Sequence, residues 1–200
     1  MQSKTFRRVT AAALLAGLAG AAQAHTGHGT HSLLAGLAHP FGLDHLLAMV
    51  AVGVWSVSAL PRAKAWQGPA TFLLALVISA VLGAAGVTVP FLEQGVALSV
   101  VLFGAMLVLA RQPMPSAIGL GLVAAAASLH GLAHGAETPS SGVAGYAIGY
   151  LATTALMHVS GVGAGLAIRR WLAARSGAAL GGLGAGLGVA GLYLFGQLAA

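Results

Sequence analysis

The chain has 200 residues, of which 58% are hydrophobic and 6% charged, and its mean hydropathy is +0.91. Soluble domains carry about 25% charged residues, so the composition excludes a soluble globular protein and indicates an integral membrane protein. The formal net charge is +6, and the lack of cysteine excludes disulfides and thiolate metal sites.

Residues 1–24 resemble a secretory signal peptide. Three cations precede an apolar run over residues 9–20, and residues 22–24 read Ala-Gln-Ala, an A-x-A cleavage site. The apolar run is shorter than the roughly 20 residues that a membrane span needs. We therefore expect cleavage before His25, with an uncleaved first helix as the alternative.

Residues 25–40 form a His-rich segment that we expect to lie outside the membrane. It contains His25, His28 and His31. Such a cluster can collect a cation or belong to a flexible tail, and both interpretations stay open.

Six later stretches are long enough to cross a bilayer. They cover residues 41–60, 69–89, 91–110, 116–136, 143–168 and 178–198, with Pro, Gly or charge at the junctions. We therefore predict an all-α polytopic membrane protein. Residues 41–200 would form a bundle of six transmembrane helices after a cleaved signal peptide.

The charges and aromatic residues predict how the bundle is oriented. With the mature N-terminus outside, the inner loops hold every Lys and Arg of the mature chain, as the positive-inside rule requires. These are Arg62, Lys64, Arg111, Arg169, Arg170 and Arg175. Trp55, Trp66 and Trp171 lie near the same ends and predict an interfacial aromatic belt. The cations therefore mark topology and do not indicate nucleic-acid binding.

The last span is rich in glycine, with Gly-x-x-x-Gly spacings such as Gly182 to Gly186. Small residues let helices approach closely. We expect these glycines to pack the bundle and assign them no function.

The first polar group inside the spans is His39, Asp44 and His45. A charged carboxylate at a helix centre in the membrane costs roughly 2.5 to 3.5 kcal/mol, so its presence indicates a function. Pro40 suits a first helical turn, and Gly42 loosens the same place. We predict that His39 folds back toward Asp44 and His45, although interhelical hydrogen bonds are an alternative role for a membrane histidine.

The second polar group is His130, His134 and Glu137 at the outer end of the fourth span. The i, i+4, i+7 spacing places them along one helical face, where a histidine pair can chelate one metal ion. A solvated helix end is the alternative. Deeper in the bilayer lie Met49, one turn beyond His45, and His158 near the midplane.

These motifs resemble the HupE/UreJ family of nickel/cobalt permeases. The string from His39 to His45, followed by Met49 and Gly53, contains the His-x4-Asp-His signature of such permeases. The string from His130 to Glu137, the pair His158 and Gly161, and the His-rich start match other marks of the family.

The resemblance implies a secondary metal permease of the bacterial inner membrane and not an enzyme. It would supply nickel or cobalt for hydrogenase, urease or cobalamin synthesis, with the ion as cargo and no permanently bound cofactor. The bilayer and the ion are the expected partners, while a homo-oligomer and a cytoplasmic metallochaperone stay open. The functional residues carried over are His39, Asp44, His45, His130, His134, Glu137 and His158.

We hypothesise that the N-terminal histidines, His25 and His28 among them, and His39 capture the ion. Asp44, His45, His130 and His134 would form the principal site, and Met49 and His158 a weaker relay inward. Imidazole and carboxylate suit several borderline divalent ions, and affinity order alone cannot select nickel. Because ligating histidines must be neutral, binding should weaken as the pH falls through about 6.5.

Two alternatives belong to other classes of protein. An intramembrane zinc-dependent hydrolase would also bury histidines and acids, but the chain has no His-Glu-x-x-His string. A haem-binding membrane protein could use His130 or His134 with His158 as axial ligands. A primary pump is disfavoured because no Gly-x4-Gly-Lys-Ser/Thr loop is present.

Overall fold

The computed structural model describes residues 33–199. Within this range every regular element is a helix: α2 (Leu33–Ala38), η1 (His39–Phe41), α3 (Leu43–Ala59), η2 (Arg62–Lys64), α4 (Gln67–Ala84), α5 (Leu92–Val108), α6 (Ser116–Ala136), α7 (Val143–Trp171), η3 (Ala173–Arg175) and α8 (Ser176–Ala199). The all-α prediction is confirmed for these residues. The predicted signal peptide and His25, His28 and His31 lie outside the described residues.

Each of the six predicted spans coincides with one of the helices α3 to α8. Four segments are long and apolar enough to cross a membrane: Arg62–Ala84, Ser116–Ala136, Val143–Trp171 and Ala173–Leu198. The pair α2 and α3 would make a fifth span if taken together, and α5 is apolar but has only 17 residues. The chain is therefore a helical membrane protein with four to five helices that meet the length and hydropathy of a span.

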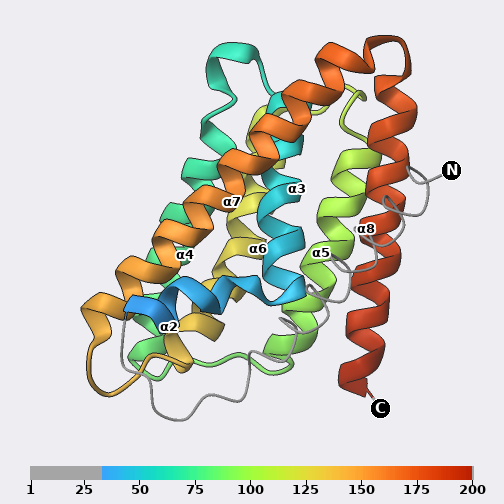
Figure 1. The fold of residues 1–200 in the computed structure, drawn as a ribbon. Coiled ribbons are helices and arrows are strands. Elements are labelled where there is room, and N and C mark those ends of the chain that lie inside the picture. Colours follow the sequence, from blue (N-terminus) through green and yellow to red (C-terminus); the bar gives the residue numbers. More distant parts are fainter. Residues whose placement is uncertain (1–32, 200) are drawn as a thin grey trace, which may run out of the picture.

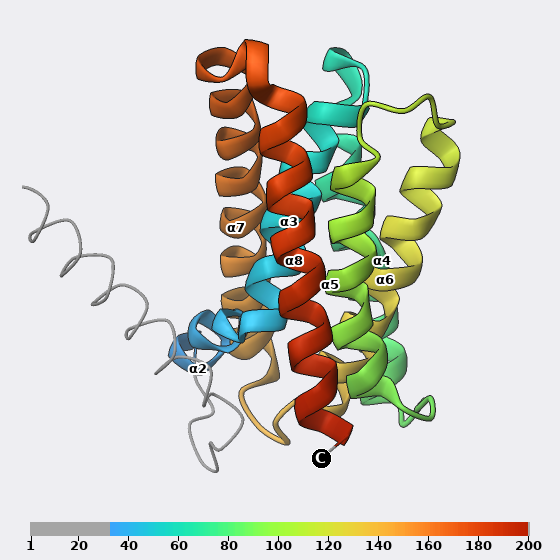
Figure 2. The same ribbon diagram turned by 90° about the vertical axis from the view of Figure 1, so that its right-hand side faces the viewer.

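Helix α3 occupies the centre of the bundle (Figures 1 and 2) and packs against α7, α5 and α4. From Ala48 to Val57 every residue except Val50 is buried. A helix that is apolar on all sides is expected in the interior of such a bundle. Its neighbours pair further outward, α4 with α6 and α5 with α8.

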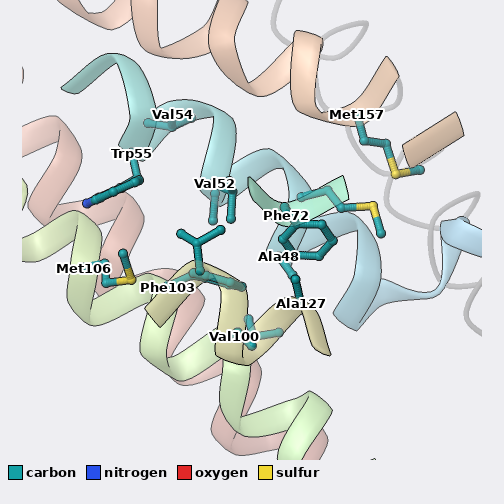
Figure 3. Packing of buried hydrophobic residues seen from close by; sticks show 14 of the residues in the cluster. Ala48, Val52, Val54, Trp55, Phe72, Val100, Phe103, Met106, Ala127 and Met157 are labelled. Carbon is teal, nitrogen blue, oxygen red and sulfur yellow. The ribbon is translucent and has the colours of Figure 1, made fainter. Parts of the chain in front are cut away.

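The hydrophobic core lies around α3. Val52 from α3, Phe72 from α4 and Phe103 from α5 gather there with Val100 and Ala127 (Figure 3), and all are at most 1% exposed. The rings of Phe72 and Phe103 are 6.4 Å apart, centroid to centroid. This layer lies next to the histidines of α3 and α6 and supports them from inside the bundle, where the Phe72 ring contacts His130.

Glycines set the spacing between paired helices. A Cβ atom at Gly135 of α6 would meet backbone atoms of Ala80 and Ala84 of α4, and Gly184 of α8 meets the backbone of α5 in the same way. By contrast, added Cβ atoms at Gly182 and Gly186 would meet nothing within 4 Å. The expectation that this Gly-x-x-x-Gly pair packs the bundle was wrong, because the opposite face of α8 is the one turned toward α5.

The chain bends by 76° between the segment Leu33–Phe41 and α3. Pro40 lies in the first turn of η1, where its missing N–H costs no helical hydrogen bond. Helix α2 is held against α7: Gly36 touches the backbone of Tyr146, and the Thr153 hydroxyl donates to the Leu37 carbonyl at 3.0 Å. Residues 33–40 of the predicted external segment are thus packed across one end of the bundle (Figure 1).

Of the three tryptophans of the predicted aromatic belt, two are exposed on the surface of the bundle, as such a belt requires, and one is not. Trp66 and Trp171 are 66% and 77% exposed, whereas Trp55 is 1% exposed. Trp55 was misassigned because Gly119 of α6 leaves room for its indole ring inside the bundle. Near the same end, Arg169 of α7 donates to the Val57 carbonyl in the last turn of α3, a stabilising contact for a helix C-terminus.

Candidate metal site

Four histidines from three segments of the chain form one cluster at the end of the bundle that α2 covers. The ring centroids of His39 and His134 are 4.6 Å apart, those of His134 and His45 are 4.7 Å apart, and those of His45 and His130 are 4.6 Å apart. His39 and His45 are 6.2 Å apart. The bend before α3 therefore brings His39 over His45, and the helical spacing on α6 presents both of its histidines to the same place.

Asp44 fixes the orientation of His45. Its Oδ1 accepts a hydrogen bond from the His45 backbone N–H at 2.7 Å and lies 2.8 Å from His45 Nδ1. An ionised carboxylate can only accept, so Nδ1 carries the proton of a neutral His45 ring. The lone pair then lies on Nε2, which is buried and has no hydrogen-bond partner among residues 33–199. A carboxylate behind a histidine is a common arrangement around metal ligands.

Ser99 of α5 fixes the orientation of the His130 ring in a similar way. The Ser99 hydroxyl donates its single hydrogen to the Val96 carbonyl at 2.7 Å, and its oxygen is 2.8 Å from His130 Nε2. The oxygen must therefore accept from Nε2–H. This leaves the lone pair of His130 on Nδ1, which has no hydrogen-bond partner in the described part of the chain.

Two tyrosines of α7 close the side of the cluster. The ring of Tyr150 stacks on His134 with centroids 4.9 Å apart and an interplanar angle of 9°. Tyr146 lies 5.5 Å from His39, edge to face. Because Tyr146 and Tyr150 are 6% and 5% exposed, they are packed inside the bundle and limit how the rings of His39 and His134 can turn.

Glu137 lies at the mouth of the cluster and not within it. Its Oε2 is 3.2 Å from His39 Nε2, and its side chain is 42% exposed against 16% for His39. The residue is the C-cap of α6, and its N–H still donates to the Ala133 carbonyl at 3.2 Å, so it continues the helical face of His130 and His134 to the rim of the cluster. The placement suits a first contact for a cation arriving from solvent.

His158 and Met49 lie deeper. His158 is 1% exposed, and its Nδ1 is 2.8 Å from the Thr154 carbonyl, which accepts the Nδ1–H and leaves the lone pair on Nε2. Met49 is fully buried within the hydrophobic core cluster. The ring of Phe72 contacts both His158 and His130, with centroids 4.8 and 5.7 Å apart.

The cluster is not a closed coordination sphere. Within residues 33–199 no group of three or more His, Asp or Glu side chains is arranged to hold one metal ion. Rings 4.6 to 4.7 Å apart are in contact, whereas metal–imidazole bonds are about 2 Å long. An ion that enters must therefore separate and turn the rings.

Sequence reasoning missed Ser99, Tyr150, Phe72 and Thr154. A serine within an apolar span is a weak signal for a buried hydrogen bond, and it could have drawn attention to Ser99. Phe72 and Tyr150 carry no signal of this kind, because aromatic residues in apolar helices are ordinary core residues. Their role becomes visible only through their contacts with histidines.

Comparisons with known proteins agree with these motifs. The family described as HupE / UreJ protein matches residues 13–194. Protein HupE of Rhizobium leguminosarum bv. viciae is 39% identical over 160 residues, which cover 79% of this chain and 83% of that protein. No solved structure matches the chain.

Proposed function

Since the chain belongs to the HupE/UreJ family, we propose that it is a secondary transporter that moves a divalent transition metal ion, nickel or cobalt, across the bacterial inner membrane. The metal is cargo, and the proposal includes no resident cofactor and no catalysed reaction. Its use would be the supply of metal for hydrogenase, urease or cobalamin synthesis.

The proposal rests on the unpaired ring nitrogens of two buried histidines. His45 and His130 each have one ring nitrogen engaged by a neighbouring acceptor and the other without a partner among the described residues. Burying an unsatisfied polar atom is costly, so two such atoms in adjacent rings call for a ligand. Imidazole nitrogens are suited to nickel and cobalt.

The proposed topology has six spans, with α3 to α8 each crossing once. The signal peptide would be cleaved, the mature N-terminus would be periplasmic, and the loops bearing Lys and Arg would be cytoplasmic. Support comes from the alternation of helices along the chain and from the position of every mature Lys and Arg in alternate connections or, for Arg169 and Arg170, in the last turn of α7. The 17 residues of α5 rise about 25 Å, so its ends would lie close to the hydrocarbon boundary.

The path of the ion would begin with capture. The N-terminal histidines, with His25 and His28 among them, and His39 beside Glu137 would collect the ion at the outer face. The principal site would use His45, His130 and His134, with Asp44 supplying charge and orienting His45. Met49 and His158 would lie further along the way in.

A site made of contacting rings suits transport. A permeating ion must bind well enough to shed water and loosely enough to leave. Because the rings must separate to admit the ion, part of the binding free energy is spent on that movement. The result would be an affinity below that of a preformed site with the same ligands.

Nickel uptake in cells lacking other nickel importers tests the proposal. Asp44→Ala and His45→Ala should each abolish most of the uptake, while Glu93→Gln should match wild type. The chain has three acidic residues, and Glu93 is the one outside the proposed site. It is exposed in the first turn of α5, so its substitution controls for the loss of a charge. Wild-type transport by both site variants would reject the proposed site.

Metal selectivity requires a separate measurement. Labelled nickel uptake would be competed by cobalt, zinc or copper at matched free concentrations. Competition by cobalt with little by zinc and copper would support the nickel/cobalt assignment. Stronger competition by zinc or copper would assign a different cargo to the same site.

The capture role of the N-terminal segment has its own test. Deleting residues 25–31 should raise the nickel concentration for half-maximal uptake more than it lowers the maximal rate. A matched variant with each histidine of this segment replaced by Gln keeps the length and tests the imidazoles alone. A loss confined to the maximal rate would contradict a capture role.

A further inference from the structure

His158 lies well below the outer histidine cluster. It is 15 residues into the 29 residues of α7, about 22 Å along the helix axis. Tyr150, which stacks on His134 of the cluster, lies eight residues earlier on the same helix, a rise of about 12 Å. His158 therefore cannot share one metal ion with His134.

Two buried polar atoms at the depth of His158 have no hydrogen-bond partner among the described residues. His158 Nε2 carries the lone pair, because Nδ1–H donates to the Thr154 carbonyl, and it has no hydrogen-bond partner among the described residues. The hydroxyl of Thr154, one turn earlier, is also buried without a partner among them. A histidine with one nitrogen held by a backbone carbonyl and the other open is the usual arrangement of a metal ligand.

The His158 side chain lies inside the protein. His158 is 1% exposed, and Gly53 of the central helix α3 packs against its backbone carbonyl. The imidazole therefore has almost no contact with the surface of the protein. An ion arriving from the outer cluster is the ligand that the neighbouring chemistry can deliver.

The ring of Phe72 contacts both His158 and His130 of the outer cluster. Its ring is fully buried, 5.7 Å from the His130 ring above and 4.8 Å from the His158 ring, centroid to centroid. Its other ring neighbour is Phe103 of α5 (Figure 3), at 6.4 Å. An apolar ring at such a point keeps water from forming a continuous column, which is how hydrophobic constrictions gate channels.

We propose that His158 is a second, inner metal-binding station and that the ring of Phe72 is the gate between it and the outer histidines. The ion leaves Nδ1 of His130 when the Phe72 ring turns aside, and Nε2 of His158 accepts it with the Thr154 hydroxyl nearby. Between transfers the ring returns and blocks protons and water. This inference rests on the proposed function, in which His158 already lies on the path, and adds to it the gate at Phe72 and the ring nitrogen by which His158 would bind the ion.

The gate is tested in proteoliposomes with Phe72→Ala and the control Phe103→Ala. Both remove a ring that is at most 1% exposed, but only Phe72 contacts histidines in the described structure. A pH-sensitive dye inside the vesicles reports proton leak under an imposed potential. We expect the leak of Phe72→Ala to exceed that of Phe103→Ala at least tenfold, and Phe72→Leu to stay low. Equal leaks in the two alanine variants would overturn the gate.

The inner station is tested with His158→Gln in the same vesicles. In equilibrium dialysis of detergent-purified protein, the outer cluster should keep its affinity for nickel within about twofold of wild type, while the weaker binding at the inner station should be lost. Nickel flux should fall at least tenfold. Retained binding also shows that the variant is folded, and wild-type flux would overturn the inner station.

If the proposed function is wrong, the same experiments give a result that differs from failure of the gate or of the inner station. In that case wild-type vesicles would show no nickel flux and the purified protein no nickel binding. The leak comparison would still be informative, because it needs no metal. A leak specific to Phe72→Ala would then support a barrier on a path for another ion, and its absence would reject the gate.

Discussion

The oxygen of Ser99 on α5 lies 2.8 Å from Nε2 of His130 on α6 and, having donated its own hydrogen to Val96, accepts the hydrogen of that ring. One serine therefore decides which nitrogen of His130 is free to bind a metal. The contact joins two helices that the sequence does not link by any motif.

Ser99→Ala should weaken nickel binding about tenfold or more, the effect expected when a partner behind a metal-binding histidine is lost. The protein would stay folded, because the variant removes one hydroxyl. Dialysis with nickel gives the affinity, and the ¹⁵N shifts of His130 report which nitrogen is protonated.

Ser128→Ala is the matched control for this change. Its hydroxyl donates only to the Ala124 carbonyl of its own helix, at 2.9 Å, so binding should not change. A mixture of His130 tautomers in Ser99→Ala with unchanged nickel affinity would contradict the positioning role.

Gly42→Ala should disturb the pair of Asp44 and His45. A Cβ atom at Gly42 would lie 2.9 Å from Asp44 Oδ1, so the carboxylate would have to shift away from His45. Because the backbone at Gly42, with φ −50° and ψ 137°, is open to alanine, folding should persist. We expect a severalfold higher nickel concentration for half-maximal uptake. Gly121→Ala, where an added Cβ meets nothing within 4 Å, should transport as wild type, and equal uptake by the two variants would count against the Asp44 and His45 pair.

Gly135→Ala should destabilise the protein, since a methyl group there would press on the backbone of Ala80 and Ala84. Overpacking of this kind costs about 1 to 3 kcal/mol. Thermal unfolding in detergent should move to a lower temperature, and nickel binding should weaken because His134 is the preceding residue. Gly186→Ala on the open face of α8 should leave both unchanged. A stable Gly135→Ala would show that α4 and α6 can separate without penalty.

Glu137→Gln should reduce capture without blocking passage. The Glu137 carboxylate, 3.2 Å from His39 Nε2, is 42% exposed, and exposed charges attract cations through a field that salt screens. The half-maximal nickel concentration should rise severalfold while the maximal rate is kept. Wild-type uptake should fall with ionic strength more steeply than that of the variant. Identical salt dependence would indicate that Glu137 has no electrostatic role at the mouth.

The predicted spans agree closely with the helices because length and hydropathy act over whole segments. Residues 116–136 were predicted as one span and form α6 with the same bounds. The placement of His130 and His134 on one face also follows from helical geometry. Glu137, the C-cap of α6, keeps the helical hydrogen bond from its N–H to the Ala133 carbonyl and reaches His39, and its partial exposure follows from the end of α6, a boundary that periodicity does not specify.

The mutual orientation of the helices could not be predicted, and Trp55 shows why. Its neighbours on α3 are apolar except Ser56 and Ser58, whose hydroxyls donate to carbonyls of their own helix, so no amphipathic pattern tells which face meets protein and which meets lipid. The answer depends on where glycines of other helices allow close approach, as Gly119 does for the Trp55 ring.

The sequence by itself determined that this is a helical membrane protein with histidines and acids near the outer ends of two spans, because hydropathy and helical spacing are local properties of the chain. The tertiary structure alone decided that Ser99, Tyr150 and Phe72 stand against those histidines. Such contacts depend on the rotation and depth of helices that are distant in the chain. Those quantities are set by packing, which no single segment encodes.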